Sequence, residues 1–166
     1  MVQNLSFVSN SDAHDTLLKW WTELENSKGE RAELRHCHNS MEVAFCPAFH
    51  RLRWSLKSVG YVNTESLAIV AGVLSHVKTR DEREHFAAQM ATRKDGGQNA
   101  IVSGLRFRRL LKVPTNRELY EPLIRIVKML DSTVNIPDLA NSIYWWNDST
   151  RKTWAFDYYE KAPNEK

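Results

Sequence analysis

The sequence predicts an all-α fold built as two small helical bundles. Apolar side chains recur along most of the chain at the three- and four-residue spacing of one helix face, and residues that cap helices stand before several of these segments. Alternation of apolar and polar residues, which is typical of β-strands, reaches no convincing length. The polar segment 92–99, TRKDGGQN, predicts a junction, so we expect residues 1–95 to form an N-terminal bundle and residues 96–166 a C-terminal bundle.

Five helices are expected before the junction. In the first, two leucines and two tryptophans share one face, and Ser11 or Asp12 can cap the helix. Pro47 suits the first turn of the third helix, where the N–H that proline lacks is not needed. The fourth helix is strongly apolar. The expected ranges are 13–26, 30–37, 47–57, 64–78 and 81–91.

Four helices are expected after the junction. Thr115 and Glu118 have the spacing of a capping box, in which each side chain accepts a hydrogen bond from the backbone N–H of the other. Asn135 and Asp138 repeat this spacing, and Asp148 can cap the last helix. The helices are expected at about 99–113, from 115 onward, at 138–146 and at 149–161.

Composition narrows the class of protein. The longest apolar run, residues 67–74, is far shorter than the roughly 18 to 20 residues that span a bilayer. The first twelve residues lack the cationic and apolar regions of a secretory signal. Only two cysteines are present, Cys37 and Cys46, and we expect them to be reduced thiols. The sequence therefore predicts a cytoplasmic protein without a membrane segment.

Positive charge is concentrated in one part of the chain. The formal net charge is only +3, but residues 96–128 contain seven cations and two acids, a net charge of +5. Residues 96–117 contain five of these cations and no acid. Such asymmetry favours an anionic partner.

The segment 104–112, GLRFRRLLK, predicts an amphipathic helix in the middle of this basic region. At 100° per residue, Phe107, Leu110 and Leu111 fall on one buried stripe, and Leu105 falls in the middle of a cationic face. The cationic face consists of Arg106, Arg108, Arg109 and Lys112. Like charges four residues apart repel each other, and a bound anion would relieve this repulsion. Spacing alone leaves two interpretations open, a solvated face or a phosphate-binding face.

Histidine and carboxylate residues suggest an alternative, a helical metalloprotein. The ExxH pairs Glu33–His36 and Glu82–His85 have the spacing found in di-iron carboxylate bundles, although two pairs exceed chance only slightly in this composition. A second possible metal site, for zinc, consists of His36, Cys37, His38, Cys46 and His50. The first three of these residues are consecutive, so a helix would point their side chains in different directions. We favour surface and packing roles for both sets, and expect no metal and no cofactor.

No motif in the sequence indicates an enzyme. There is no glycine-flanked Ser or Cys nucleophile and no glycine-rich phosphate-binding loop. The six tryptophans could be stacking platforms for bases, but they lie in apolar-periodic segments, so we expect most of them in the core or at an interface.

Several motifs together resemble one family. In chain order they are RAELRHC, PAFHRL, SGLRFRRLLK, VNIPDLANSIYWW and RKTWAFDYYEK, and they extend from about residue 17 to residue 161. Their order and spacing are similar to those of the small subunit of the type I-E CRISPR Cascade complex, the CasB family. The resemblance implies two helical bundles, no catalytic activity, and a head-to-tail pair of copies beside the backbone and large subunits. It also implies contact with the crRNA–target hybrid and the displaced DNA strand, which would keep the R-loop open in antiviral defence.

The resemblance also implies the nucleic-acid-binding residues. Basic positions along the family's nucleic-acid path correspond here to Arg106, Lys112, Arg125, Arg151 and Lys152, with Arg108 and Arg109 as neighbours. Arg31 and Arg35 match family positions as well. Arg51 also matches, but it could equally be a structural partner to a buried carboxylate or a helix end. Family members often carry an acid where Leu105 stands, so the resemblance gives Leu105 no role.

Overall fold

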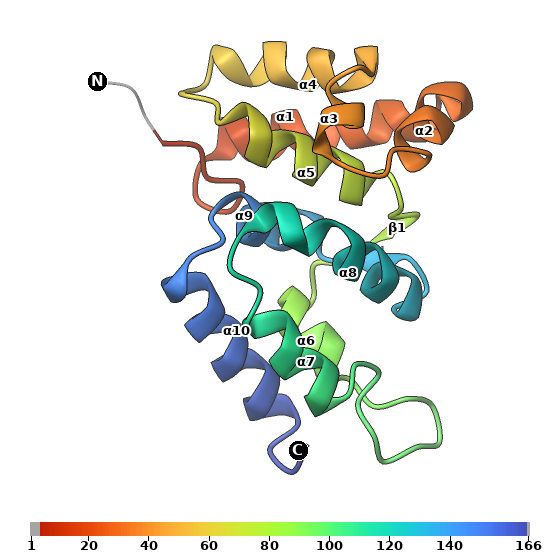
Figure 1. Cartoon of the computed structure of the whole chain (residues 1–166), viewed down its shortest axis with the longest axis vertical. Helices are drawn as coiled ribbons and strands as arrows, with labels where there is room; N and C mark the ends of the chain where they lie inside the picture. Colours follow the sequence, from red (N-terminus) through yellow and green to blue (C-terminus); the bar gives the residue numbers. More distant parts are fainter. Residues whose placement is uncertain (1–3, 166) are drawn as a thin grey trace.

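The computed structural model describes residues 4–165 and confirms the all-α fold class (Figure 1). Within these residues the chain forms ten helices and two very short strands. In chain order they are α1 (Ser11–Glu25), α2 (Lys28–Arg35), α3 (Ser40–Val43), α4 (Pro47–Lys57), α5 (Thr64–Leu74), β1 (Thr79–Arg80), α6 (Phe86–Ala91), α7 (Gly104–Leu111), α8 (Asn116–Met129), β2 (Thr133–Val134), α9 (Ile136–Tyr144) and α10 (Asp148–Lys161).

The first four helices form the upper part of the molecule in Figure 1. Helix α1 begins at Ser11, two residues before the predicted start, because the cap is Asn10, whose side chain accepts hydrogen bonds from the backbone N–H groups of Asp12 and Ala13. Its leucine and tryptophan face is buried and packs against α2 and α4. Helix α4 begins at Pro47 as predicted. The short helix α3, capped by the Asn39 side chain, was not predicted.

Helix α5 is the centre of the core. From Ser66 to Leu74 every residue is buried, and the helix contacts α2, α3, α4, α8 and α9. Its approach to α8 is very close at Gly72, where an added Cβ would lie 2.5 Å from the Tyr120 ring. The Tyr120 hydroxyl donates to the carbonyl of Cys37, 3.0 Å away, and this bond fixes the ring. Glycine is therefore needed at this contact for space.

Two predicted helices are shorter in the structure. Helix α5 ends at Leu74, and the chain then turns into β1, which pairs in parallel with β2. Helix α6 begins only at Phe86, whose backbone N–H donates to the carboxylate of Asp138, 2.8 Å away. The two strands have two residues each, and such a length produces no recognisable alternation.

The predicted helix at 99–113 is also shorter, because α7 begins at Gly104. The side chain of Ser103, which was predicted inside the helix, caps it by accepting from the N–H of Arg106. The preceding residues instead bond to the end of α6: the N–H of Ile101 donates to Thr92, and that of Val102 to Met90.

Helices α6, α7 and α10 form the lower part of the molecule in Figure 1, and α8 and α9 lie between them and the upper helices. Helix α6 packs mainly against α10, whereas α8 and α9 pack on α5. One hydrophobic core therefore extends through both predicted halves. The division at residue 95 stays a prediction.

Three of the six tryptophans are buried in the core, namely Trp20, Trp21 and Trp154. The indoles of Trp145 and Trp146 are partly buried and donate hydrogen bonds to backbone carbonyls. Trp54 differs from the others because it is 67% exposed. None of the helices in residues 4–165 combines the length and apolar character needed to cross a membrane.

Candidate nucleic-acid interface

Helix α7 presents its cations to solvent, as its periodicity predicted. Phe107 and Leu110 are buried, and the ring of Phe107 stacks on that of Tyr158 with 3.9 Å between centroids and 5° between planes. The Tyr158 hydroxyl in turn donates to the carbonyl of Val102, just before α7. These contacts fix the rotation of α7 about its axis. The exposed residues on the opposite side are Leu105, Arg106, Arg108, Arg109 and Lys112.

A groove of about 500 Å³ lies between α7 and α8. Arg106 and Arg109 line it from α7, and Arg125 lines it from α8. The remaining lining residues are Ser103, Leu105, Leu110, Val113, Pro122 and Ile126. No carboxylate is among these residues, so three guanidinium groups surround a largely apolar surface. We call this the α7–α8 groove.

The cations of α7 have no internal counter-ion. Within residues 4–165, the side chains of Arg106, Arg108, Arg109 and Lys112 make no hydrogen bond and no ion pair. Arg125 has only a loose, exposed partner, Glu121, with 3.7 Å between nitrogen and oxygen. Exposed pairs of this kind contribute little to stability and are easily exchanged for another anion. The groove is therefore available to an anionic ligand.

Arg151 and Lys152, at the start of α10, differ in their surroundings. The Arg151 guanidinium donates to the carbonyls of Val113 and Pro114, at 2.6 and 3.0 Å, and lies over the ring of Trp146. These bonds connect α10 to the segment between α7 and α8. Lys152 is exposed and, within the described part of the chain, has no partner. Lys152 therefore extends the cationic surface, while Arg151 holds helices together.

Arg31 and Arg35 contact the end of α5. Both donate from Nε to the carbonyl of Ser75, at 3.2 and 2.9 Å, and Arg31 also donates to the carbonyl of Val77. Carbonyls at a helix C-terminus have no partner within the helix, and cations are favourable there. Burial, together with neighbouring cations, lowers the pKa of His76 to about 4, so His76 adds no charge at neutral pH. Some N–H donors of Arg31 and Arg35 are therefore already used in hydrogen bonds to backbone carbonyls.

Arg51 donates to both carboxylate oxygens of Glu30, so it has a structural carboxylate partner, although Glu30 is partly buried and not fully buried as expected. The bond to Glu30 raises the pKa of Arg51, and the bond to Arg51 lowers the pKa of Glu30. Arg51 therefore connects α2 to α4.

The residues considered as metal ligands do not assemble into a site. Among residues 4–165, no three His, Cys, Asp or Glu side chains gather as metal ligands would. His85 instead lies 3.0 Å from a carboxylate oxygen of Asp157, and His50 lies 2.7 Å from the carbonyl of Ala44. The sulfur atoms of the two cysteines are 3.5 Å apart. Burial is the main cause that raises the pKa of both thiols.

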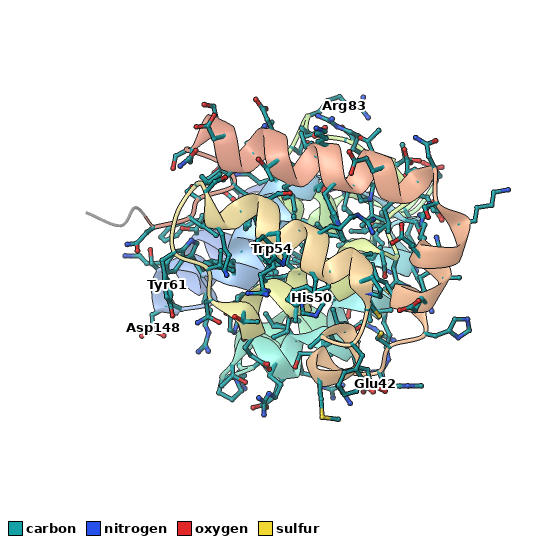
Figure 2. All side chains as sticks on the ribbon, turned by 90° about the horizontal axis from the view of Figure 1, so that it is seen from above. Glu42, His50, Trp54, Tyr61, Arg83 and Asp148 are labelled. Carbon is teal, nitrogen blue, oxygen red and sulfur yellow. The ribbon has the colours of Figure 1, made fainter. Side chains whose placement is uncertain are left out.

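A second groove, of about 530 Å³, lies between α1 and α4. Figure 2 shows Trp54 and His50 on α4, and both residues line this groove. Its charges are mixed, because Lys19 and Glu23 both line it and Arg51 is paired. It therefore lacks the single sign of charge that distinguishes the α7–α8 groove.

The structure adds apolar walls that sequence reasoning missed. Pro122 and Ile126 on α8, and Val113 before it, meet the cations of α7 only through the packing of the two helices. The sequence contained one signal of this arrangement, the placement of Leu105 within a cationic face. Leu105 is 49% exposed and lines the groove.

Comparisons with known proteins bear on both the family and the fold. A family model described as CRISPR-associated protein Cse2 matches residues 30–159. A chain in the crystal structure of E. coli Cascade bound to a PAM-containing dsDNA target is similar in fold, with a TM-score of 0.67 and 17% sequence identity. The alignment covers 89% of this chain and 97% of that chain. At this identity the likeness shows the fold alone. A comparison with curated protein sequences gave no match.

Proposed function

Because the chain belongs to the Cse2 family of CRISPR-associated proteins, we propose that it is a non-catalytic small subunit of a Cascade complex that binds the nucleic-acid backbone. The family match confirms the resemblance that the motifs indicated. The observation that carries the proposal is the cationic surface of α7 and α8, whose α7 cations have no partner within residues 4–165. The similar chain comes from a Cascade structure with bound DNA, which supports the same proposal.

The proposed ligand is the displaced DNA strand of an R-loop. Exchanging a DNA duplex for an RNA–DNA hybrid is nearly balanced in free energy, so modest contacts to the displaced strand are enough to favour the open state. Contacts between cations and phosphates release counterions and do not depend on the base sequence. The α7–α8 groove, which has no carboxylate among its lining residues, meets these requirements. The partners in this proposal are crRNA, target DNA, the backbone and large subunits, and a second copy of the chain, all in the cytoplasm.

We propose a contact set that consists of the exposed cations. It comprises Arg106, Arg108, Arg109, Lys112, Arg125 and Lys152. Arg31, Arg35 and Arg151 stay in the proposal with a mainly structural role, because each donates hydrogen bonds to backbone carbonyls. A phosphate could reach only the donors that these bonds leave free.

The test is the salt dependence of binding to a single-stranded oligonucleotide. In the double variant Arg108→Glu with Arg109→Glu, two phosphate contacts are lost. Each contact contributes about 0.7 to the slope of log K against log salt for a single strand, so we expect the slope to fall by about 1.4. Fluorescence anisotropy from low to moderate salt measures this slope.

A matched control reverses two charges elsewhere. Lys19→Glu with Lys57→Glu makes the same change in net charge on α1 and α4, where both lysines are exposed. We expect the slope of this control to remain near that of the unmodified protein. Equal slopes in all three proteins would refute the assignment of the interface to α7. Intact assembly of the complex with no DNA contribution at any salt would indicate a purely protein-binding scaffold instead.

A further inference from the structure

The α7–α8 groove contains more apolar surface than phosphate binding requires. Leu105 is half-exposed between cations, and its neighbours in the groove include the partly buried Val113 and Pro122. Phosphate oxygens gain from charge and hydrogen-bond donors, and gain nothing from these apolar groups. The apolar lining therefore suits a ligand with an apolar face as well as a negative charge.

A nucleotide with an unstacked base combines these two properties. The face of a base packs on apolar side chains, and it also stacks on the planar guanidinium of arginine. Arg106 and Arg109 lie beside Leu105 on the surface of α7, at 100° and 40° from it around the helix axis by the 100° repeat. Arg125 lines the opposite wall. The groove volume of about 500 Å³ is within the roughly 300–1,000 Å³ of typical small-ligand pockets.

We propose that the α7–α8 groove holds an unstacked base of single-stranded DNA, with Leu105 beneath the base and the arginines on the adjacent phosphates. This inference rests on the proposed function and specifies the ligand of the same surface. Bases in a duplex are stacked and present only their edges. The groove therefore distinguishes a displaced single strand from a duplex without reading the sequence.

The experiment compares two single strands that have the same number of phosphates, one of deoxythymidine and one of abasic sites. Binding of the full chain to each is measured by anisotropy at one low salt concentration. We expect the thymidine strand to bind about fivefold more tightly than the abasic strand, since contacts to a base contribute about 1 kcal/mol or more. Leu105→Ala is expected to remove this preference while leaving the affinity for the abasic strand unchanged.

Two controls separate the possible outcomes. Met41→Ala truncates another exposed apolar side chain, on α3 and outside the groove, and we expect it to keep the preference. Melting temperatures show whether Leu105→Ala remains folded, as its half-exposed position leads us to expect. Equal affinity of the unmodified chain for both strands, or an equal loss of affinity for both in Leu105→Ala, overturns the base-binding proposal and leaves backbone binding intact. Absence of binding to either strand at low salt overturns the proposed function, and the base-binding proposal with it.

Discussion

The contact between Gly72 and Tyr120 provides a quantitative test of how α5 and α8 are held together. In Gly72→Ala the new Cβ would lie 2.5 Å from the Tyr120 Cε2 and Oη atoms, so the buried ring must move. Overpacking of this kind costs about 1–3 kcal/mol. Loss of the bond from the Tyr120 hydroxyl to Cys37 adds about 1 kcal/mol, and the higher helix propensity of alanine offsets about 1 kcal/mol.

The net expectation for Gly72→Ala is a loss of about 2 kcal/mol in the free energy of unfolding. In a chain of this size, such a loss lowers the melting temperature by about 4–8 °C. Urea unfolding followed by circular dichroism measures the free energy directly. A more stable Gly72→Ala protein would refute the reasoning, because helix propensity would then outweigh the overlap.

In a protein that also carries Tyr120→Leu, we expect Gly72→Ala to stabilise the fold and not to destabilise it. Tyr120→Leu removes the ring atoms and hydroxyl that the new Cβ would meet. In that background, Gly72→Ala should stabilise the protein by about 1 kcal/mol through helix propensity. The double-mutant cycle thus isolates the overlap from all other effects of each substitution. Additive effects of the two substitutions would contradict the close contact.

Two further predictions concern the lower helices. Arg151→Ala removes two hydrogen bonds from a charged donor, although the Val113 carbonyl keeps its bond from the Trp146 indole, so we expect a loss of about 1–3 kcal/mol in urea unfolding; an unchanged midpoint would argue against the structural role. The bond to Asp157 raises the pKa of His85, so its stabilisation is complete below the unfolded-state value of about 6.5 and disappears as pH rises through the folded-state value. Asp157→Asn should therefore destabilise more at pH 5.5 than at pH 8.5, and an equal loss at both would disprove the linkage.

Periodicity was sufficient to locate most helices, although Asn10 caps α1 in place of Ser11 or Asp12, and Asn147 caps α10 in place of Asp148. Pro47 begins α4, and the exposed and buried sides of α7 agree with the 100° repeat.

Helix ends were less accurate. Val77 lies four residues after Val73 and fits the apolar face of a longer helix, and residues 75–78 contain no glycine or proline to end one, yet the chain turns there to form β1. Ser103 similarly fits a helical position, but its hydroxyl caps the helix from outside.

The roles of individual arginines could not be predicted from the sequence. Arg31 and Arg109 both occupy polar positions in helical segments, yet one donates to the end of α5 and the other lines a groove. What separates them is an acceptor 44 residues away in the chain, the carbonyl of Ser75. The sequence predicted the exposed cationic face of α7, but only the packing of α7 against α8 shows which cations share a surface with Leu105.

The uniform burial of α5 has a consequence for synthesis of the chain. One side of this helix contacts α3 and α4, which precede it, and another contacts α8 and α9, which follow it. When Leu74 has left the ribosome, the residues that cover its second side, up to Tyr144, have not yet been made. The nascent chain therefore carries an uncovered apolar helix until most of its length is synthesised, and its folding is completed late rather than half by half.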